Sequence, residues 1–159
     1  MITALCLGME ASQAQQMADQ VLVDKSESRL YLLKDSEIIT SFRVRFGSNP
    51  KGHKQQQGDG RTPEGRYILD YKNINSAFYK SIHISYTNAQ DRKSAWQRGV
   101  DPGGDIMIHG KRTSAGCLAM GDDAAEELFV LVAEVGKSNT TLIIAPTDFR
   151  SAAAPPPAV

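Results

Sequence analysis

The chain has 159 residues, which is the length of one domain with a single hydrophobic core. Apolar residues make up 41% of it, a fraction that argues against global disorder, and 18 basic residues balance 18 acidic ones. Because nucleic-acid-binding surfaces carry a clear basic excess, we expect no nucleic-acid partner.

The amino-terminal stretch is apolar from Met1 to Met9, and small residues follow at Ser12 and Ala14. This pattern is typical of a secretory signal, although the run is short and lacks a basic start. We predict a signal-peptide remnant and leader over residues 1–19, and export of the protein. No other stretch has the roughly 20 apolar residues that a membrane span needs, so we expect no stable membrane insertion.

Short runs of alternating apolar and polar residues predict a mainly β domain over residues 20–147. Strands are expected at residues 21–23, 30–33, 38–46, 66–71, 82–86, 106–108 and 140–145. Residues 47–60 offer nothing apolar to bury and are predicted to form a long surface loop, with His53 exposed to solvent. The tail over residues 148–159, rich in Ala and Pro, is predicted to be disordered.

Two helices are expected in this chain. The shorter one covers residues 89–98, with Asn88 as its N-cap, Gly99 as its stop and Trp96 as its anchor in the core. The longer one covers residues 122–135, where acidic residues fill the first turn and an apolar face recurs at helical spacing.

A single cysteine, Cys117, lies outside the predicted leader, eight positions after His109. His109 ends an apolar run, and Cys117 follows Gly116 on the approach to the longer helix, so the two could meet as base and nucleophile. The backbone N–H groups of Gly116 and Cys117 could then face an oxyanion. The nearby helix start and the cations Lys111 and Arg112 favour a thiolate.

Three other readings of these residues remain open. A lone cysteine is often a buried, inert thiol. A zinc site could draw on His53, His83, His109 and Cys117, although no two of them show the close spacing of zinc ligands. A serine hydrolase at Ser114 lacks the Gly-x-Ser-x-Gly elbow, and closing a turn is the simpler role for that hydroxyl.

The run Ile108-His109-Gly110, followed by Ser114-Ala115-Gly116-Cys117, resembles the catalytic signature of the L,D-transpeptidase (YkuD/ErfK) family. The similarity extends from about residue 21 to residue 145. It includes residues 23–32, 58–65, 83–86 and 102–105.

The resemblance implies an L,D-transpeptidase-type β-sandwich with one long and one short helix. It implies a periplasmic or cell-wall enzyme acting on peptidoglycan stem peptides, with Cys117 as the nucleophile at an L,D peptide bond of diaminopimelate. His109 would be its base, oriented by the backbone of Gly110, and neither a metal nor another cofactor is expected. The oligomeric state does not follow from the sequence.

The match departs from the commonest family pattern in a short loop before Cys117 and in Ala115 and Ala119, which stand where His and Arg or Asn are frequent. It is closer to a short-loop branch similar to the YafK-type proteins, some of which hydrolyse. An L,D-carboxypeptidase, endopeptidase or amidase using the same acyl-enzyme is therefore the alternative to transpeptidation, and a non-catalytic wall-binding domain is the third possibility. Lys111 and Arg112 are candidate ligands of a stem-peptide carboxylate.

Two residues of the strand at 82–86 are further candidates for the substrate-binding site. His83 and Tyr86 could line the cleft, and His83 could hydrogen-bond the substrate or the catalytic histidine. A lone strand histidine is more often structural.

Overall fold

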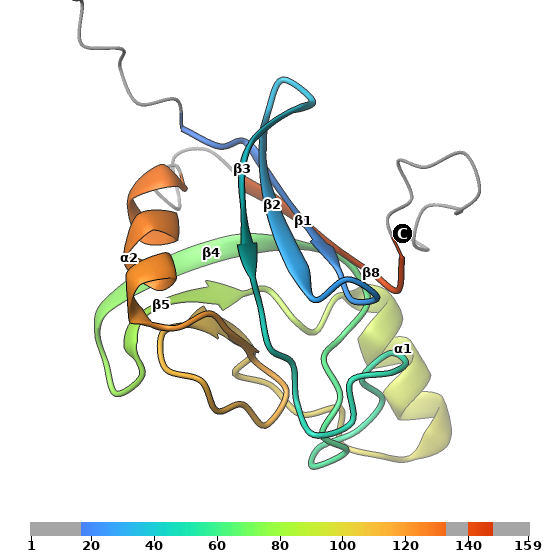
Figure 1. Ribbon diagram of the computed structural model, residues 1–159. Helices are drawn as coiled ribbons and strands as arrows, with labels where there is room; N and C mark the ends of the chain where they lie inside the picture. The colour runs from blue at the N-terminus through green and yellow to red at the C-terminus, as the bar shows by residue number, and fades with distance from the viewer. Residues whose placement is uncertain (1–16, 133–139, 148–159) are drawn as a thin grey trace, which may run out of the picture.

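The computed structural model describes residues 17–132 and 140–147 and shows a curled β-sheet flanked by two helices (Figure 1). The strands are β1 (Gln20–Asp24), β2 (Arg29–Lys34), β3 (Glu37–Arg43), β4 (Gly65–Ser76), β5 (Tyr79–Ile84), β6 (Met107–His109), β7 (Leu118–Ala119) and β8 (Thr140–Ala145). The prediction of a mainly β domain is confirmed. β7 was not predicted, because two residues are too short a run to show alternation.

The sheet runs in the order β3-β2-β1-β8-β4-β5-β6-β7. The first three strands form an antiparallel meander, and parallel pairing of β1 with β8 joins it to the rest. Just past β3, Arg45 forms an isolated antiparallel bridge with Ala119 of β7. This bridge brings the two ends of the sheet order together, so the sheet curls back on itself.

The core fills the inside of the curl with apolar side chains from strands that are far apart in the sequence. Its largest fully buried members are Leu30, Leu32, Leu69, Ile82, Ile84, Ile108, Leu118, Leu128, Leu142 and Ile144. Burying one leucine or isoleucine contributes roughly 1.5–3 kcal/mol, so this cluster is the main source of stability. Ile108 and Leu118 belong to it, and β6 and β7 are therefore anchored in the core.

Helix α1 (Ala89–Arg98) has the predicted ends. The Asn88 side chain accepts from the backbone of Asp91, the Asp91 carboxylate accepts from the backbone of Asn88, and Gly99 caps the helix in the left-handed conformation. The expectation that Trp96 anchors this helix is wrong, because its side chain is 84% exposed. Ala95 faces the protein instead.

Helix α2 (Asp122–Leu131) packs against β5 and β6. It begins where predicted but ends earlier, because Val132 is extended and forms a parallel bridge with Ala18. Both helices therefore have ten residues in the described part of the chain. Over residues 17–132, the expected contrast between a long and a short helix is wrong. The rest of the predicted helix lies outside the described residues.

Ala18 is buried at 1% exposure, although it falls within the segment that the sequence analysis assigned to a leader. The rest of that segment, residues 1–16, and the tail over residues 148–159 lie outside the described part of the chain. Among the helices that are described, none has both the length and the apolar character needed to cross a membrane.

The loop over residues 47–60 is not purely a surface loop, contrary to the sequence prediction. Lys54 is only 4% exposed, and its ammonium group donates to Gln56 O and Asp59 Oδ1. His53 is held by its two ring nitrogens, with Nδ1 accepting from the Glu64 backbone and Nε2 lying 2.9 Å from Asp91 Oδ1. These contacts tie the loop to α1 and to the start of β4.

Candidate active site

Strands β6 and β7 place His109 and Cys117 on one face of the sheet. The strands are parallel, with Ile108 opposite Leu118 and His109 opposite Ala119, so Cys117 lies one position before the paired segment. Side chains alternate along a strand, so His109 and Cys117 both lie on the face opposite the buried Ile108 and Leu118. Strand spacing and rise put their Cα atoms about 8 Å apart, which an imidazole side chain can bridge.

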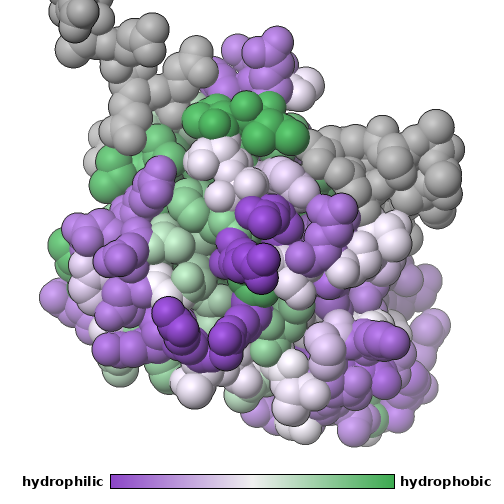
Figure 2. All heavy atoms as spheres, viewed as in Figure 1, coloured by the Kyte–Doolittle hydropathy of each residue, from purple (hydrophilic) through white to green (hydrophobic). Residues whose placement is uncertain are grey.

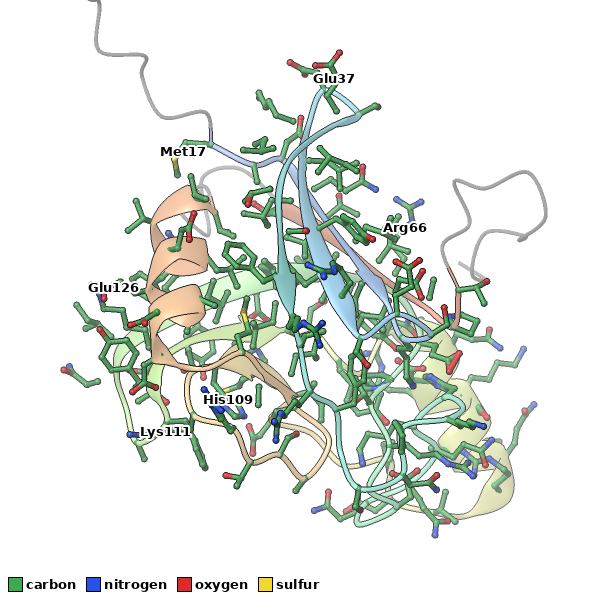
Figure 3. All side chains as sticks on the ribbon, in the orientation of Figure 1. Met17, Glu37, Arg66, His109, Lys111 and Glu126 are labelled. Atoms are coloured by element: carbon green, nitrogen blue, oxygen red, sulfur yellow. The ribbon has the colours of Figure 1, made fainter. Side chains whose placement is uncertain are left out.

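The His109 side chain is held in one tautomer. It is 2% exposed, packs against Phe78 with ring centroids 4.8 Å apart, and its Nδ1 contacts the carbonyl oxygen of Gly110. A carbonyl oxygen only accepts hydrogen bonds, so Nδ1 is the donor and, in the neutral ring, Nε2 is the nitrogen with the lone pair. This contact is the one that the expected orienting role of the Gly110 backbone would use. Figure 3 shows His109 near the start of α2.

The Cys117 thiol is partly buried and donates to the carbonyl oxygen of Asp105, 3.6 Å away. Burial raises the pKa of this thiol above its ordinary value of 9.0. The backbone hydrogen bond of Met107 acts in the opposite direction, the carboxylate of Asp105 adds to the rise, and the ammonium of Lys54 lowers the pKa. In the free protein the thiol form is therefore favoured.

The expectation of a thiolate stabilised by Lys111, Arg112 and the helix start is wrong for the free protein. β7 and Gly121 stand between Cys117 and α2, so the thiol is not at the helix N-terminus. Lys111 is exposed and pairs with Asp122 instead, with 3.9 Å between Nζ and Oδ2. The cation that acts on the thiol is Lys54, which belongs to the loop over residues 47–60.

Ser114 shapes the turn before the cysteine. Its hydroxyl donates to Cys117 O at 2.5 Å and accepts from Gly116 N at 3.0 Å. The Gly116 N–H is therefore occupied, contrary to its expected role as an oxyanion donor. The N–H of Cys117 itself makes no hydrogen bond within the described part of the chain, so it is the available donor.

One residue outside the motif holds this turn in place and another acts on the thiol, and the sequence analysis identified neither. Thr62 is fully buried, and its hydroxyl donates to Gly116 O at 2.9 Å. Lys54 is the second residue: its charge lowers the pKa of the Cys117 thiol, and its side chain lies beside Gly103. The available signal was their place in and just after the loop over residues 47–60, which we predicted only as a surface loop.

The remaining predicted residues have other partners. His83 stacks on Tyr71 with 4.8 Å between ring centroids, and its Nδ1 lies 2.5 Å from Asp70 Oδ1. The Tyr86 hydroxyl donates to Pro102 O at 2.7 Å, and burial raises its pKa. Tyr86 thus supports the segment that carries Asp105, whereas His83 contacts neither His109 nor Cys117.

The zinc reading finds no support among the residues that the structure describes. His53 and His83 are each engaged by a separate carboxylate, and within the described residues no group of three or more His, Cys, Asp or Glu side chains could hold a metal ion. The site combines the Cys117 thiol, the Cys117 N–H and the imidazole of His109, whose Nε2 makes no hydrogen bond within the described residues. These are the groups that acyl transfer through a thioester requires.

Comparison with known proteins gives a consistent picture. The profile of the L,D-transpeptidase catalytic domain, YkuD, matches residues 6–144. YafK of Escherichia coli (strain K12), which is named as a candidate L,D-transpeptidase, is 35% identical over 98 residues. That match covers 60% of this chain and 38% of YafK, so the chain spans well under half of that relative.

Solved structures share the fold. The helical cell shape determining protein Pgp2 of Campylobacter jejuni aligns with a TM-score of 0.63 and 23% identity, covering 91% of this chain and 51% of Pgp2. L,D-transpeptidase 1 of Mycobacterium tuberculosis aligns with a TM-score of 0.51 and 13% identity, covering 79% of this chain and 60% of that protein. At these identities the alignments concern the fold alone.

Proposed function

This chain belongs to the L,D-transpeptidase catalytic domain family, and on that premise we propose that it is a cysteine acyltransferase acting on the stem peptides of peptidoglycan. The proposal is supported by two observations: His109 and Cys117 lie on the same face of β6 and β7, and His109 Nδ1 contacts Gly110 O. That contact leaves Nε2 as the proton acceptor on the face of the sheet that also carries the thiol.

The proposed reaction begins when the substrate reaches the thiol. Nε2 of His109 takes the proton from Cys117 Sγ, and the sulfur attacks the carbonyl carbon of an L,D peptide bond at diaminopimelate. The Cys117 N–H stabilises the resulting oxyanion. The imidazolium then gives its proton to the departing amine of the D-amino acid, which leaves a thioester on Cys117. An acceptor amine or water resolves the thioester, with His109 again accepting a proton.

The raised pKa of the thiol fits this order of events. Because the free protein favours the neutral thiol, the proton moves to His109 when substrate binds rather than beforehand. Peptidoglycan lies outside the cytoplasmic membrane, so we place the protein in the periplasm or cell wall, in line with the proposed export.

Hydrolysis is the second candidate for the fate of the thioester. Only a short loop separates Gly110 from Cys117, and Ala115 in it is exposed and carries only a methyl group. Water therefore has an open approach from this side, which would release the acyl group as a tripeptide.

Disaccharide tetrapeptides, incubated with and without a D-amino acid as acceptor, separate these activities by mass spectrometry. A product joined to the acceptor indicates a transpeptidase, and a tripeptide alone indicates a hydrolase. Cys117→Ala should abolish both. If wild type and Cys117→Ala both leave the tetrapeptide intact, the proposed function is wrong.

A further inference from the structure

A hollow lies where the chain just past β3 meets β7, and three arginines line it. It has a volume of about 210 Å³. Its lining residues are Arg43, Val44, Arg45, Arg112, Ala119, Met120 and Gly121. Strongly hydrophilic side chains gather in the middle of this face, in the region where Figure 1 shows the end of β3 (Figure 2).

The three arginines have no counter-charge within the described residues. None of their guanidinium groups makes a hydrogen bond or an ion pair there, whereas Lys54 and Lys80 each pair with a carboxylate. Two carboxylates, Asp122 and Asp123, line the adjoining hollow together with Arg112. Lys111 engages Asp122, and Asp123 forms no ion pair with any of the three arginines within the described residues. Three unpaired cations around one small hollow repel one another, and an anion bound between them would relieve that repulsion.

Backbone hydrogen bonds fix the position of this hollow relative to the candidate catalytic residues. Arg45 N donates to Ala119 O at 2.8 Å, and Ala119 N donates to Arg45 O at 2.9 Å. Ala119 in turn pairs with His109, so Arg45, Ala119 and His109 form one row across the sheet. Directly paired residues share a face, and two strand spacings put the Cα atoms of Arg45 and His109 about 10 Å apart. That is the span of one or two residues of a bound peptide.

We propose that Arg43, Arg45 and Arg112 form a subsite that binds a free carboxylate of the stem peptide while its L,D bond lies at Cys117. This inference rests on the proposed function. The planar guanidinium fork matches a carboxylate by two parallel hydrogen bonds, and stem peptides containing γ-linked glutamate and diaminopimelate carry free carboxylates close to the reacting bond. The small side chain of Ala119 leaves the floor of the hollow open for that group.

Binding is measured by calorimetry on full-length Cys117→Ala protein, in which turnover is blocked. One ligand is the tetrapeptide with free carboxylates, and the other is the same peptide with those carboxylates amidated. Arg45→Gln and Arg112→Gln are compared with Arg66→Gln, a matched control that removes another exposed, unpaired arginine from β4. Figure 3 shows Arg66 well away from His109. Thermal unfolding verifies that each variant is folded.

The expected result is that Arg45→Gln and Arg112→Gln each weaken binding of the free-acid peptide by roughly tenfold, while Arg66→Gln has no effect. The amidated peptide should bind weakly to the parent, with an affinity that the substitutions do not change. Equal binding of both peptides to all variants, or no detectable binding at all, would overturn the inference. Wild-type turnover, measured separately, decides the proposed function. If the wild type turns over the substrate but binding does not depend on Arg45 or Arg112, only the subsite is wrong. If binding depends on these arginines but the wild type shows no turnover, only the proposed activity is wrong.

Discussion

The protonation state of Cys117 in the free protein is the most specific electrostatic consequence of this structure. Burial raises the pKa of the thiol above 9.0, with the carboxylate of Asp105 acting in the same direction. A thiol with a pKa of 9.0 is about 1% thiolate at pH 7, so Cys117 should have less than that. It should therefore react more slowly with an alkylating reagent than a simple, fully exposed thiol.

The rate of alkylation by iodoacetamide between pH 6 and pH 11 tests this expectation. A Cys6→Ser background leaves one thiol, and peptide mass spectrometry follows its modification. The rate should still be rising at pH 9. Lys54→Met removes the cation that lowers the pKa of the thiol, so it should slow the reaction at pH 8. Lys93→Met, on the exposed side of α1, is the matched control and should leave the rate unchanged.

A midpoint at or below pH 8.5 would refute this reasoning. It would mean that an imidazolium–thiolate pair already exists before substrate binds. An unchanged rate in folded Lys54→Met protein would show that the charge of Lys54 does not lower the pKa of the thiol.

Three further predictions concern the residues around the site. Thr62→Val should lower the free energy of unfolding by about 1–3 kcal/mol in urea titrations, because Gly116 O loses its buried donor, while Thr62→Ser keeps the hydroxyl and should lose less. The pKa of Asp59 is held at about 2, against 3.8 ordinarily, because hydrogen bonds from its neighbours outweigh the opposing effect of burial. A depressed carboxylate pKa stabilises the fold above the unfolded value, so Asp59→Asn should cost about 1–2 kcal/mol at pH 5–7, and the difference should shrink as the pH falls from 4 to 2. A difference that persisted unchanged at pH 2 would contradict this assignment. Gly110→Ala should destabilise the protein by about 1–3 kcal/mol and reduce turnover, because a Cβ there would come within 3 Å of three neighbouring atoms and displace the carbonyl that holds His109. Unchanged turnover would contradict the orienting role of that carbonyl.

The strand that ends at His109 and the start of α2 could be predicted because their patterns are local. A short apolar run marks the strand, and a run of acidic residues before an apolar helical face marks the helix. The role of Gly110 came from the family resemblance, because a hydrogen bond between a histidine and the next carbonyl has no signature in composition or spacing.

Lys54, Thr62 and Arg45 could not be found in this way, since each acts through a partner distant in sequence. Lys54 resembles a solvated lysine in a polar loop until the fold buries it beside Asp59. Arg45 acquires its position only when the sheet curls and its backbone meets Ala119. The shift of the Cys117 pKa was predicted with the wrong sign for the same reason. Nearby cations are visible in the sequence, whereas burial of the thiol is a property of the folded chain.

The most direct test of the central claim is the intact mass of the protein after rapid mixing with a disaccharide tetrapeptide and quenching in acid. The account predicts an adduct with the mass of the donor less its terminal D-amino acid, located on the peptide that contains Cys117 and absent from Cys117→Ala. Product formation by Cys117→Ala, or an adduct on another residue, would contradict it.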